Sequence, residues 1–179
     1  MEYLTQLSQL VVYGMISGSI ITLGAIGLSL TYRILNFANF AHGDMMSLGA
    51  YLALAFLMLF RKLGFLDRPF GALSFGLWMA TAFLMAMLFA AGVAILIDKM
   101  LYQRLRRGGA IILLIASVGV ALILRNIILL FAGPQPQEYS ETIQIARELW
   151  GIRIKPDQIF IIGLALMLVF LLHVFLQKT

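Results

Sequence analysis

Two carboxamides, an imidazole and a carboxylate lie within nine residues of this chain, between two apolar runs. They belong to Asn36, Asn39, His42 and Asp44. Polar groups at membrane depth cost several kcal/mol each unless they are paired, so such clusters usually face protein or a water-filled path. This segment is therefore the first candidate for a functional site.

Asn36, Asn39 and His42 follow one another at intervals of three residues. On a helix this spacing would place the three side chains on one side, where they could line a substrate pathway together. The alternative is that they form satisfied hydrogen bonds that only hold the helices together. A metal site is not predicted at His42, because no second histidine or cysteine lies at ligand spacing.

Asp44 immediately precedes an apolar run that begins at Met45, which is the position of a helix N-cap. A carboxylate there accepts backbone N–H bonds and meets the positive end of the helix dipole. Gly43 would supply the turn before it. We predict capping as the main role of Asp44, with pathway lining as the alternative for Gly43 and Asp44.

The composition predicts an integral membrane protein. Hydrophobic residues make up 62% of the 179 positions and the mean hydropathy is +0.98, whereas soluble domains are about 45 to 50% apolar. The chain has no cysteine, which excludes disulfides and thiolate metal ligands. Its net charge of +5 comes from basic residues between apolar runs, which favours membrane-flanking loops over nucleic-acid binding.

Apolar runs set the predicted fold, an all-α integral membrane protein with about five transmembrane helices. A polar segment between the first two helices is predicted to be broken or re-entrant, and its residues would complete the short second run. The runs are Leu10–Leu30, Met45–Phe60, Leu73–Ile97, Ile111–Phe131 and Ile159–Leu176.

Small residues in the first run suit helix packing. Gly14 and Gly18 form a G-x-x-x-G pattern, and Gly24 and Gly27 continue it. Glycines at this spacing let another helix approach closely in lipid. We predict packing within this chain, with a subunit interface as the alternative.

Arg125 and Asn126 interrupt the fourth run near its end. A charge inside a span is a functional candidate by default, and pathway lining or interface anchoring are both open for this pair. For Arg125 we favour snorkelling to the headgroups or pairing with a loop acid, because its stem is long.

The segment from Gly133 to Gln158 is long and acid-balanced, and it is predicted to be external, on the side of the membrane away from the cytoplasm. Residues 142–145 alternate as in a short strand, while Ile145 to Leu149 could form a helix turn. Trp150 suits the membrane interface. This surface would either dock a partner or be a solvated loop.

The chain resembles the branched-chain amino acid ABC transporter permeases. Asn39 to Asp44 reads N-F-A-H-G-D, as in the N-terminal signature of that family, and Gly49-Ala50 follows. The stretches Ser117–Ala121 and Leu129–Pro134 resemble later family segments in the same order.

The resemblance implies a multi-pass permease subunit in the bacterial inner membrane that imports branched-chain amino acids. Its implied partners are a second permease subunit, two cytoplasmic ATPase subunits and a periplasmic binding protein. Related permeases carry urea or short amides, and a non-transporting scaffold subunit is a further alternative. Family members are longer, so residues 1–179 are expected to be an incomplete permease domain that lacks the coupling segment and later spans.

Catalytic motifs are absent from this sequence. It contains no G-x-x-x-x-G-K-[ST] phosphate loop and no evident nucleophile or carboxylate pair, so we expect no enzymatic activity and no cofactor. ATP would then bind the partner subunits.

Loop charges predict the orientation. The segment from Asp98 to Gly109 is basic, which places it in the cytoplasm, with the N-terminus outside. The basic residues Arg61, Lys62 and Arg68 argue against this orientation. In intact cells we expect Arg106→Cys to resist a membrane-impermeant thiol reagent and Ser140→Cys to react with it. The reverse labelling pattern would overturn the orientation.

Overall fold

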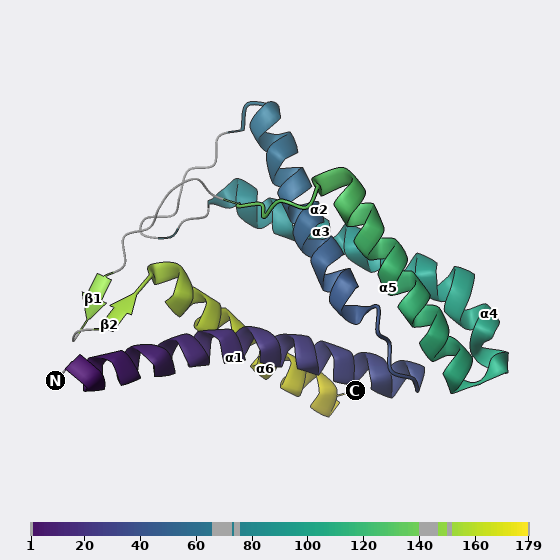
Figure 1. Ribbon diagram of the computed structural model, residues 1–179. Coiled ribbons are helices and arrows are strands. Elements are labelled where there is room, and N and C mark those ends of the chain that lie inside the picture. Colours follow the sequence, from purple (N-terminus) through teal and green to yellow (C-terminus); the bar gives the residue numbers. More distant parts are fainter. Residues whose placement is uncertain (1, 66–72, 74–75, 140–146, 150–151, 179) are drawn as a thin grey trace. The chain divides into compact units, whose positions relative to one another are not determined.

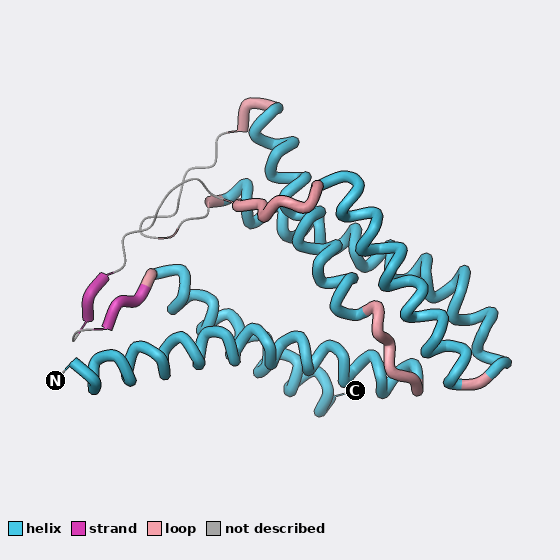
Figure 2. Tube along the Cα trace, viewed as in Figure 1, coloured by secondary structure: helices cyan, strands magenta, loops and turns pink. Residues whose placement is uncertain are grey.

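The computed structural model describes residues 2–65, 73, 76–139, 147–149 and 152–178 (Figure 1). Most of the described chain is helical (Figure 2). Its elements, in chain order, are α1 (Glu2–Leu35), α2 (His42–Lys62), α3 (Leu77–Ile97), the π-helix η1 (Asp98–Tyr102), α4 (Gln103–Leu105), the 3-10 helix η2 (Arg106–Gly108), α5 (Ala110–Ala132), β1 (Arg147–Leu149), β2 (Ile152–Ile154) and α6 (Pro156–Lys178).

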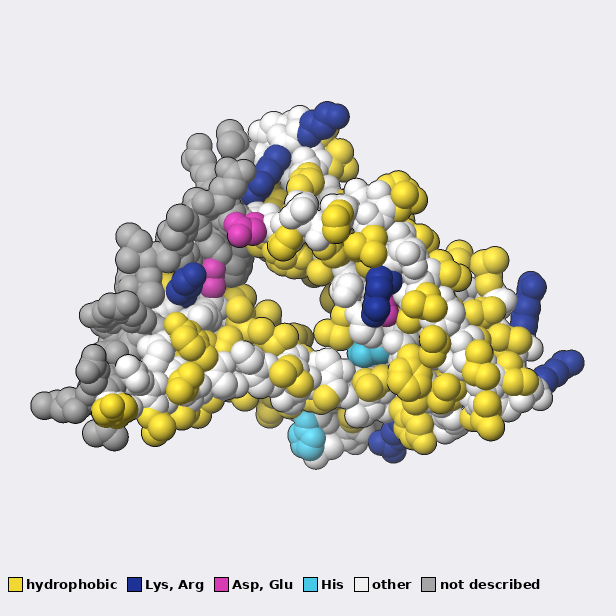
Figure 3. Space-filling view, in the orientation of Figure 1, with side chains coloured by type: hydrophobic (Ala, Val, Ile, Leu, Met, Phe, Trp, Pro, Cys, Tyr) yellow, Lys and Arg dark blue, Asp and Glu magenta, His cyan; other side chains and the backbone are white. Residues whose placement is uncertain are grey.

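Five helical segments are long and apolar enough to cross a membrane, which confirms the predicted fold class. Apolar side chains cover much of their visible surface, as a lipid environment requires (Figure 3). The chain is therefore a multi-pass membrane protein. The five segments are Gln6–Leu35, His42–Lys62, Leu77–Gly108, Ala110–Ala132 and Pro156–Lys178.

The predicted break between the first two spans is confirmed. Residues 36–41 are not helical, and α2 begins at His42, so the end of the polar segment completes the second span. Asn36, Asn39 and His42 therefore do not share one helix, and the prediction that helical spacing aligns them is wrong. An interval of three residues aligns side chains only on a continuous helix, and α1 ends at Leu35.

The described chain divides into two compact units. One contains residues 1–27, 71–74 and 142–179. Within it, β1 and β2 form an antiparallel hairpin in which Arg147 pairs with Ile154 and Leu149 with Ile152. A helix turn over residues 147–149 is thus wrong. The alternative strand over 142–145 and the interfacial Trp150 lie outside the described residues.

A Cβ atom built at Gly14 or Gly18 would meet no atom within 4 Å. The described residues of the first unit therefore make no close helix contact at these two positions. Packing within this chain and a contact with another subunit both stay predictions, as does the role of Gly24 and Gly27.

The second unit contains residues 28–70 and 75–141. In it α2 packs against both α3 and α5 (Figure 1). Small side chains make the α2–α3 contact: Ala53, Ala82 and Ala86 are buried, and the Gly49 position lies 4.0 Å from the Ala90 Cβ. Small residues let two backbones approach closely where lipid offers no hydrophobic drive.

The α5 helix turns a regular face toward this unit. Its buried residues recur every three or four positions, which is one stripe of an α-helix. They are Leu113, Ser117, Val120, Leu124 and Ile128. Three of them join the core cluster that also contains Phe37, Ala41 and Tyr102, so α5 packs directly on the broken segment.

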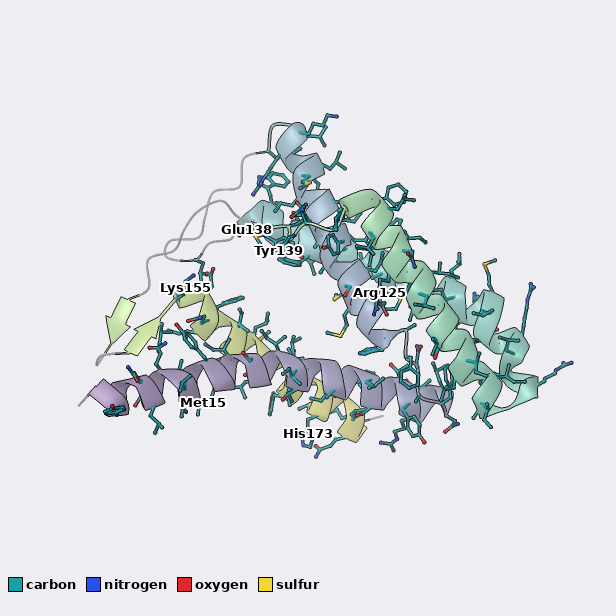
Figure 4. The ribbon with its side chains drawn as sticks, in the orientation of Figure 1. Met15, Arg125, Glu138, Tyr139, Lys155 and His173 are labelled. Carbon is teal, nitrogen blue, oxygen red and sulfur yellow. The ribbon has the colours of Figure 1, made fainter. Side chains whose placement is uncertain are left out.

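The chain after α5 returns over α2 through Tyr139 (Figure 4). The Tyr139 hydroxyl donates to the carbonyl of Ala50 at 2.8 Å, and Arg61 Nη2 donates to the Tyr139 carbonyl at 2.8 Å. Burial, with a smaller effect of Tyr51, raises the pKa of the Tyr139 phenol, so the hydroxyl stays a donor at neutral pH. These bonds fix the end of the second unit.

The α2–α3 contact yields a stability prediction. Ala86→Leu inserts bulk where the side chain is 3% exposed, so we expect a loss of about 1 to 3 kcal/mol in the free energy of unfolding, measured in detergent micelles. Ala91→Leu adds the same bulk at an exposed position of α3 and should be nearly neutral. Equal effects of the two substitutions would contradict this packing.

Candidate functional site

Asn36 ends α1. Its φ angle is 57°, in the left-handed region, and its N–H donates to the Tyr32 carbonyl at 2.8 Å. Asparagine adopts this conformation more readily than most residues, and it caps helix C-termini in this way. The Asn36 side chain is exposed and does not line the cavity described below. A helix-ending role, which the spacing argument missed, accounts for this residue.

Asn39 lies at the centre of the broken segment's hydrogen bonds. Its Oδ1 accepts the Tyr102 hydroxyl at 3.1 Å and the Ala41 N–H at 3.1 Å. The rings of Phe37 and Tyr102 meet edge to face, with centroids 5.2 Å apart. Tyr102, which lies on a neighbouring helical segment, thus holds the non-helical residues in place. Nothing in the sequence pattern had assigned Tyr102 to the site.

A π-helix places Tyr102 there. Residues Asp98 to Tyr102 form η1 directly after α3, and single π-turns inside helices are often found at functional sites. Asp98 accepts a hydrogen bond from Gln103 Nε2 at 2.8 Å and pairs with Arg106 Nη2 at 3.4 Å. Asp98 and Tyr102, at the two ends of η1, also line one and the same cavity.

Asn39 and His42 line one cavity of about 170 Å³, here called the signature cavity. Its polar lining also includes Thr31, Asp98 and Tyr102. The remaining lining is apolar: Leu35, Ala41, Met45, Ala94, Ile97 and Val120. The structure thus brings together two of the three predicted pathway residues and combines them with an aliphatic wall.

Ser117 is a site residue for which no role was predicted, although it begins the family-like stretch Ser117–Ala121. It is fully buried, accepts the Phe40 N–H at 3.1 Å and donates to the Leu114 carbonyl at 2.7 Å. The Phe40 N–H belongs to non-helical backbone, so without Ser117 it would lack this partner. The feature of the sequence that could have identified Ser117 is its hydroxyl within an apolar run.

Asp44 does not cap α2, so the capping prediction is wrong. The cap position is Ala41, without a side-chain hydrogen bond, and both Gly43 and Asp44 lie inside the first turn. The turn predicted at Gly43 is therefore also wrong. Asp44 remains near the positive end of the helix dipole, where a carboxylate is favourable.

Arg125 is the partner of Asp44. Its Nε lies 3.1 Å from Asp44 Oδ1 and bridges α5 to α2. The acid is a helix residue, so pairing with a loop acid is wrong for Arg125, whereas snorkelling to the headgroups and a pathway or anchor role stay predictions. Asn126 Nδ2 donates to the Leu122 carbonyl of its own helix at 2.7 Å, and its pathway or anchor role stays a prediction.

Ser117 gives a test of the broken segment. Ser117→Ala removes the acceptor of the Phe40 N–H, so we expect a loss of about 1 to 3 kcal/mol in unfolding free energy in detergent. Ser47→Ala is the matched control, because the Ser47 hydroxyl is exposed and, among the described residues, bonds only the Gly43 carbonyl of its own helix. A Ser117→Ala protein as stable as the control would show that water replaces the hydroxyl.

Comparisons with known proteins agree with this architecture. The family model described as branched-chain amino acid transport system / permease component matches residues 10–179. No solved structure matches the chain.

Two curated relatives are similar over most of this chain. The high-affinity branched-chain amino acid transport system permease protein BraD of Pseudomonas aeruginosa is 32% identical over 72% of this chain and 38% of its own length. The corresponding permease protein LivH of Escherichia coli K12 is 28% identical over 67% of this chain and 37% of its own. The chain therefore spans well under half the length of these relatives. The match over residues 10–179 shows that the chain belongs to the family of branched-chain amino acid transport system permease components.

Proposed function

We propose that the chain is part of a permease subunit of an ATP-driven importer that carries branched-chain amino acids across the bacterial inner membrane. The observation that carries this proposal is the signature cavity, in a family whose relatives are permease proteins of such systems. The cavity sets the polar groups of Asn39 and His42 beside aliphatic side chains. That combination suits a small zwitterion with an apolar side chain.

The signature cavity would act as one stage of alternating access. Binding of ATP to two cytoplasmic ATPase partners would move the paired permeases, and the amino acid would pass from a periplasmic binding protein into the path. A transport path must release what it binds, so a few weak polar contacts serve better than a tight site. The small number of polar groups in the signature cavity fits this requirement.

Two surfaces are assigned to partners in this proposal. The open face of α1 at Gly14 and Gly18 would meet the second permease subunit, because a helix can approach there closely. The segment from Gly133 to Gln158 would face the periplasmic binding protein. Co-purification of an ATPase and a binding protein separates this proposal from a scaffold subunit, which needs neither.

His42 provides the test of the path. In the full-length permease assembled with its partners in proteoliposomes, His42→Leu should lower leucine uptake severalfold while assembly stays normal, because one polar wall of the cavity is lost. Met46→Leu changes an exposed residue of the same helix and should leave uptake unchanged. Undiminished leucine uptake by His42→Leu would exclude the signature cavity as the path.

Substrate competition tests the transported class in the same vesicles. Excess unlabelled isoleucine should abolish uptake of labelled leucine, and excess urea should not. Competition by urea with no effect of isoleucine would assign the protein to the urea and short-amide carriers instead.

A further inference from the structure

A second, larger cavity lies on the contact between α2 and α5, here called the seam cavity. Its volume is about 510 Å³, within the range of about 300 to 1,000 Å³ typical of small-molecule sites. The lining is mostly aliphatic and aromatic: it runs from Leu48 to Met58 on α2 and from Ile127 to Ala132 on α5, with Gln137 beyond. None of these residues belongs to the signature cavity.

The Asp44–Arg125 pair lies beside the seam cavity, at the end formed by Leu48 and Ile128. Phe40 bonds Ser117 and Asp44 pairs with Arg125, so α2 and α5 run in the same direction along their contact. Leu48 follows Asp44 by one helical turn, and Ile128 follows Arg125 by about one turn; both line the cavity. The cavity therefore begins one turn past the ion pair.

Arg125 uses only one of its hydrogen-bond donors, Nε, in the pair with Asp44. No described residue of the second unit accepts a bond from its two terminal nitrogens, which carry four N–H bonds. The side chain is 64% exposed, whereas that of Asp44 is 12% exposed. Asp44 therefore holds the guanidinium in place, while the terminal edge has no acceptor among the described residues of the second unit. A guanidinium edge of this kind binds a carboxylate through two parallel hydrogen bonds.

The depth of Arg125 requires a partner for this edge. It lies about 22 Å along α5 from the helix start at Ala110 and about 10 Å before the end at Ala132, at 1.5 Å per residue. A charge exposed at that depth faces a polar ligand, protein or water and not hydrocarbon.

We propose that Arg125 and the seam cavity form a substrate site, in which the guanidinium binds the α-carboxylate of a branched-chain amino acid and the aliphatic side chain enters the seam cavity. This inference rests on the proposed transport function. Arg125 is the binding residue, and Asp44 is its positioning residue.

A phospholipid fits this site poorly. The seam cavity lies between Arg125 and the C-terminal end of α5 at Ala132. A ligand that binds Arg125 and also fills the seam cavity would therefore place its charged group deeper in the membrane than its apolar part. A phospholipid of the leaflet at that end of α5 has its charged headgroup at the surface and its apolar chains deeper. From the other end of α5, Arg125 is about 22 Å away, which is too deep for a headgroup in a core about 30 Å thick.

Leucine uptake by the full-length permease, assembled with its partners in proteoliposomes, tests the proposal. Arg125→Gln should lower uptake at least tenfold. Because this change leaves Asp44 unpaired and could impair assembly, the double variant Asp44→Asn, Arg125→Gln is the decisive one. It replaces the ion pair by two neutral side chains, and we expect normal assembly with uptake still at least tenfold lower.

The outcomes separate the possible roles of Arg125. Leucine uptake restored in the double variant would mean that the pair only holds α2 to α5. Failure of the double variant to join the second permease subunit would mean that Arg125 contacts that subunit. Either result overturns the proposal. Absence of leucine uptake in the unaltered complex would instead reject the proposed transport function.

The apolar half of the site has its own variant. Ala55→Trp places bulk in the seam cavity from a side chain that is not buried in the core, so we expect severalfold lower leucine uptake with normal assembly. Ala91→Trp adds the same bulk at an exposed position of α3 outside the cavity and should transport normally. Equal uptake by the two variants would exclude the seam cavity as the place of the aliphatic side chain.

Discussion

Backbone that leaves the helical path inside a membrane must find hydrogen-bond partners within the protein, because hydrocarbon offers none. Residues 36–41 of this chain leave the helical path directly between two candidate spans. The Asn36 N–H reaches back to Tyr32, the Phe40 N–H reaches across to Ser117, and the Ala41 N–H is held by the Asn39 side chain. Two of these bonds are local to the segment and the end of α1, and the third ties the segment to α5.

Satisfying the break requires two other helices to come close. Ser117 brings α5 against it, and Tyr102 brings the end of the α3 segment against it. Tyr102 reaches Asn39 from η1, where the chain departs from α-helical geometry a second time. Two irregular stretches thus meet, and residues of both line the signature cavity.

The Asp44–Arg125 pair solves a related problem of charge. A carboxylate at the start of α2 is stabilised by the helix dipole, but a nearly buried carboxylate also needs a counter-charge. Arg125 provides it from α5, and the two charges fix the register of the parallel helices. The same pairing leaves the far edge of the guanidinium exposed, so one contact both supports the fold and presents a donor surface beside an apolar cavity.

Much of this architecture could be predicted from the amino-acid sequence. Length and hydropathy predicted five spans, since a bilayer of fixed thickness demands long apolar runs. The polar residues between the first two runs predicted a break, and the order of the motifs predicted the family. These features depend on local composition, which a sequence displays directly.

The tertiary structure alone decided the roles within the polar segment. Asn36, Asn39 and Asp44 read as one cluster in the sequence, yet they respectively end α1, bind Tyr102 and pair with Arg125. The partners of Asn39 and Asp44 lie 63 and 81 residues away. Spacing along the chain carries no information about such distant contacts. Such contacts depend on how the helices pack, and this packing depends on all the side chains of the unit together.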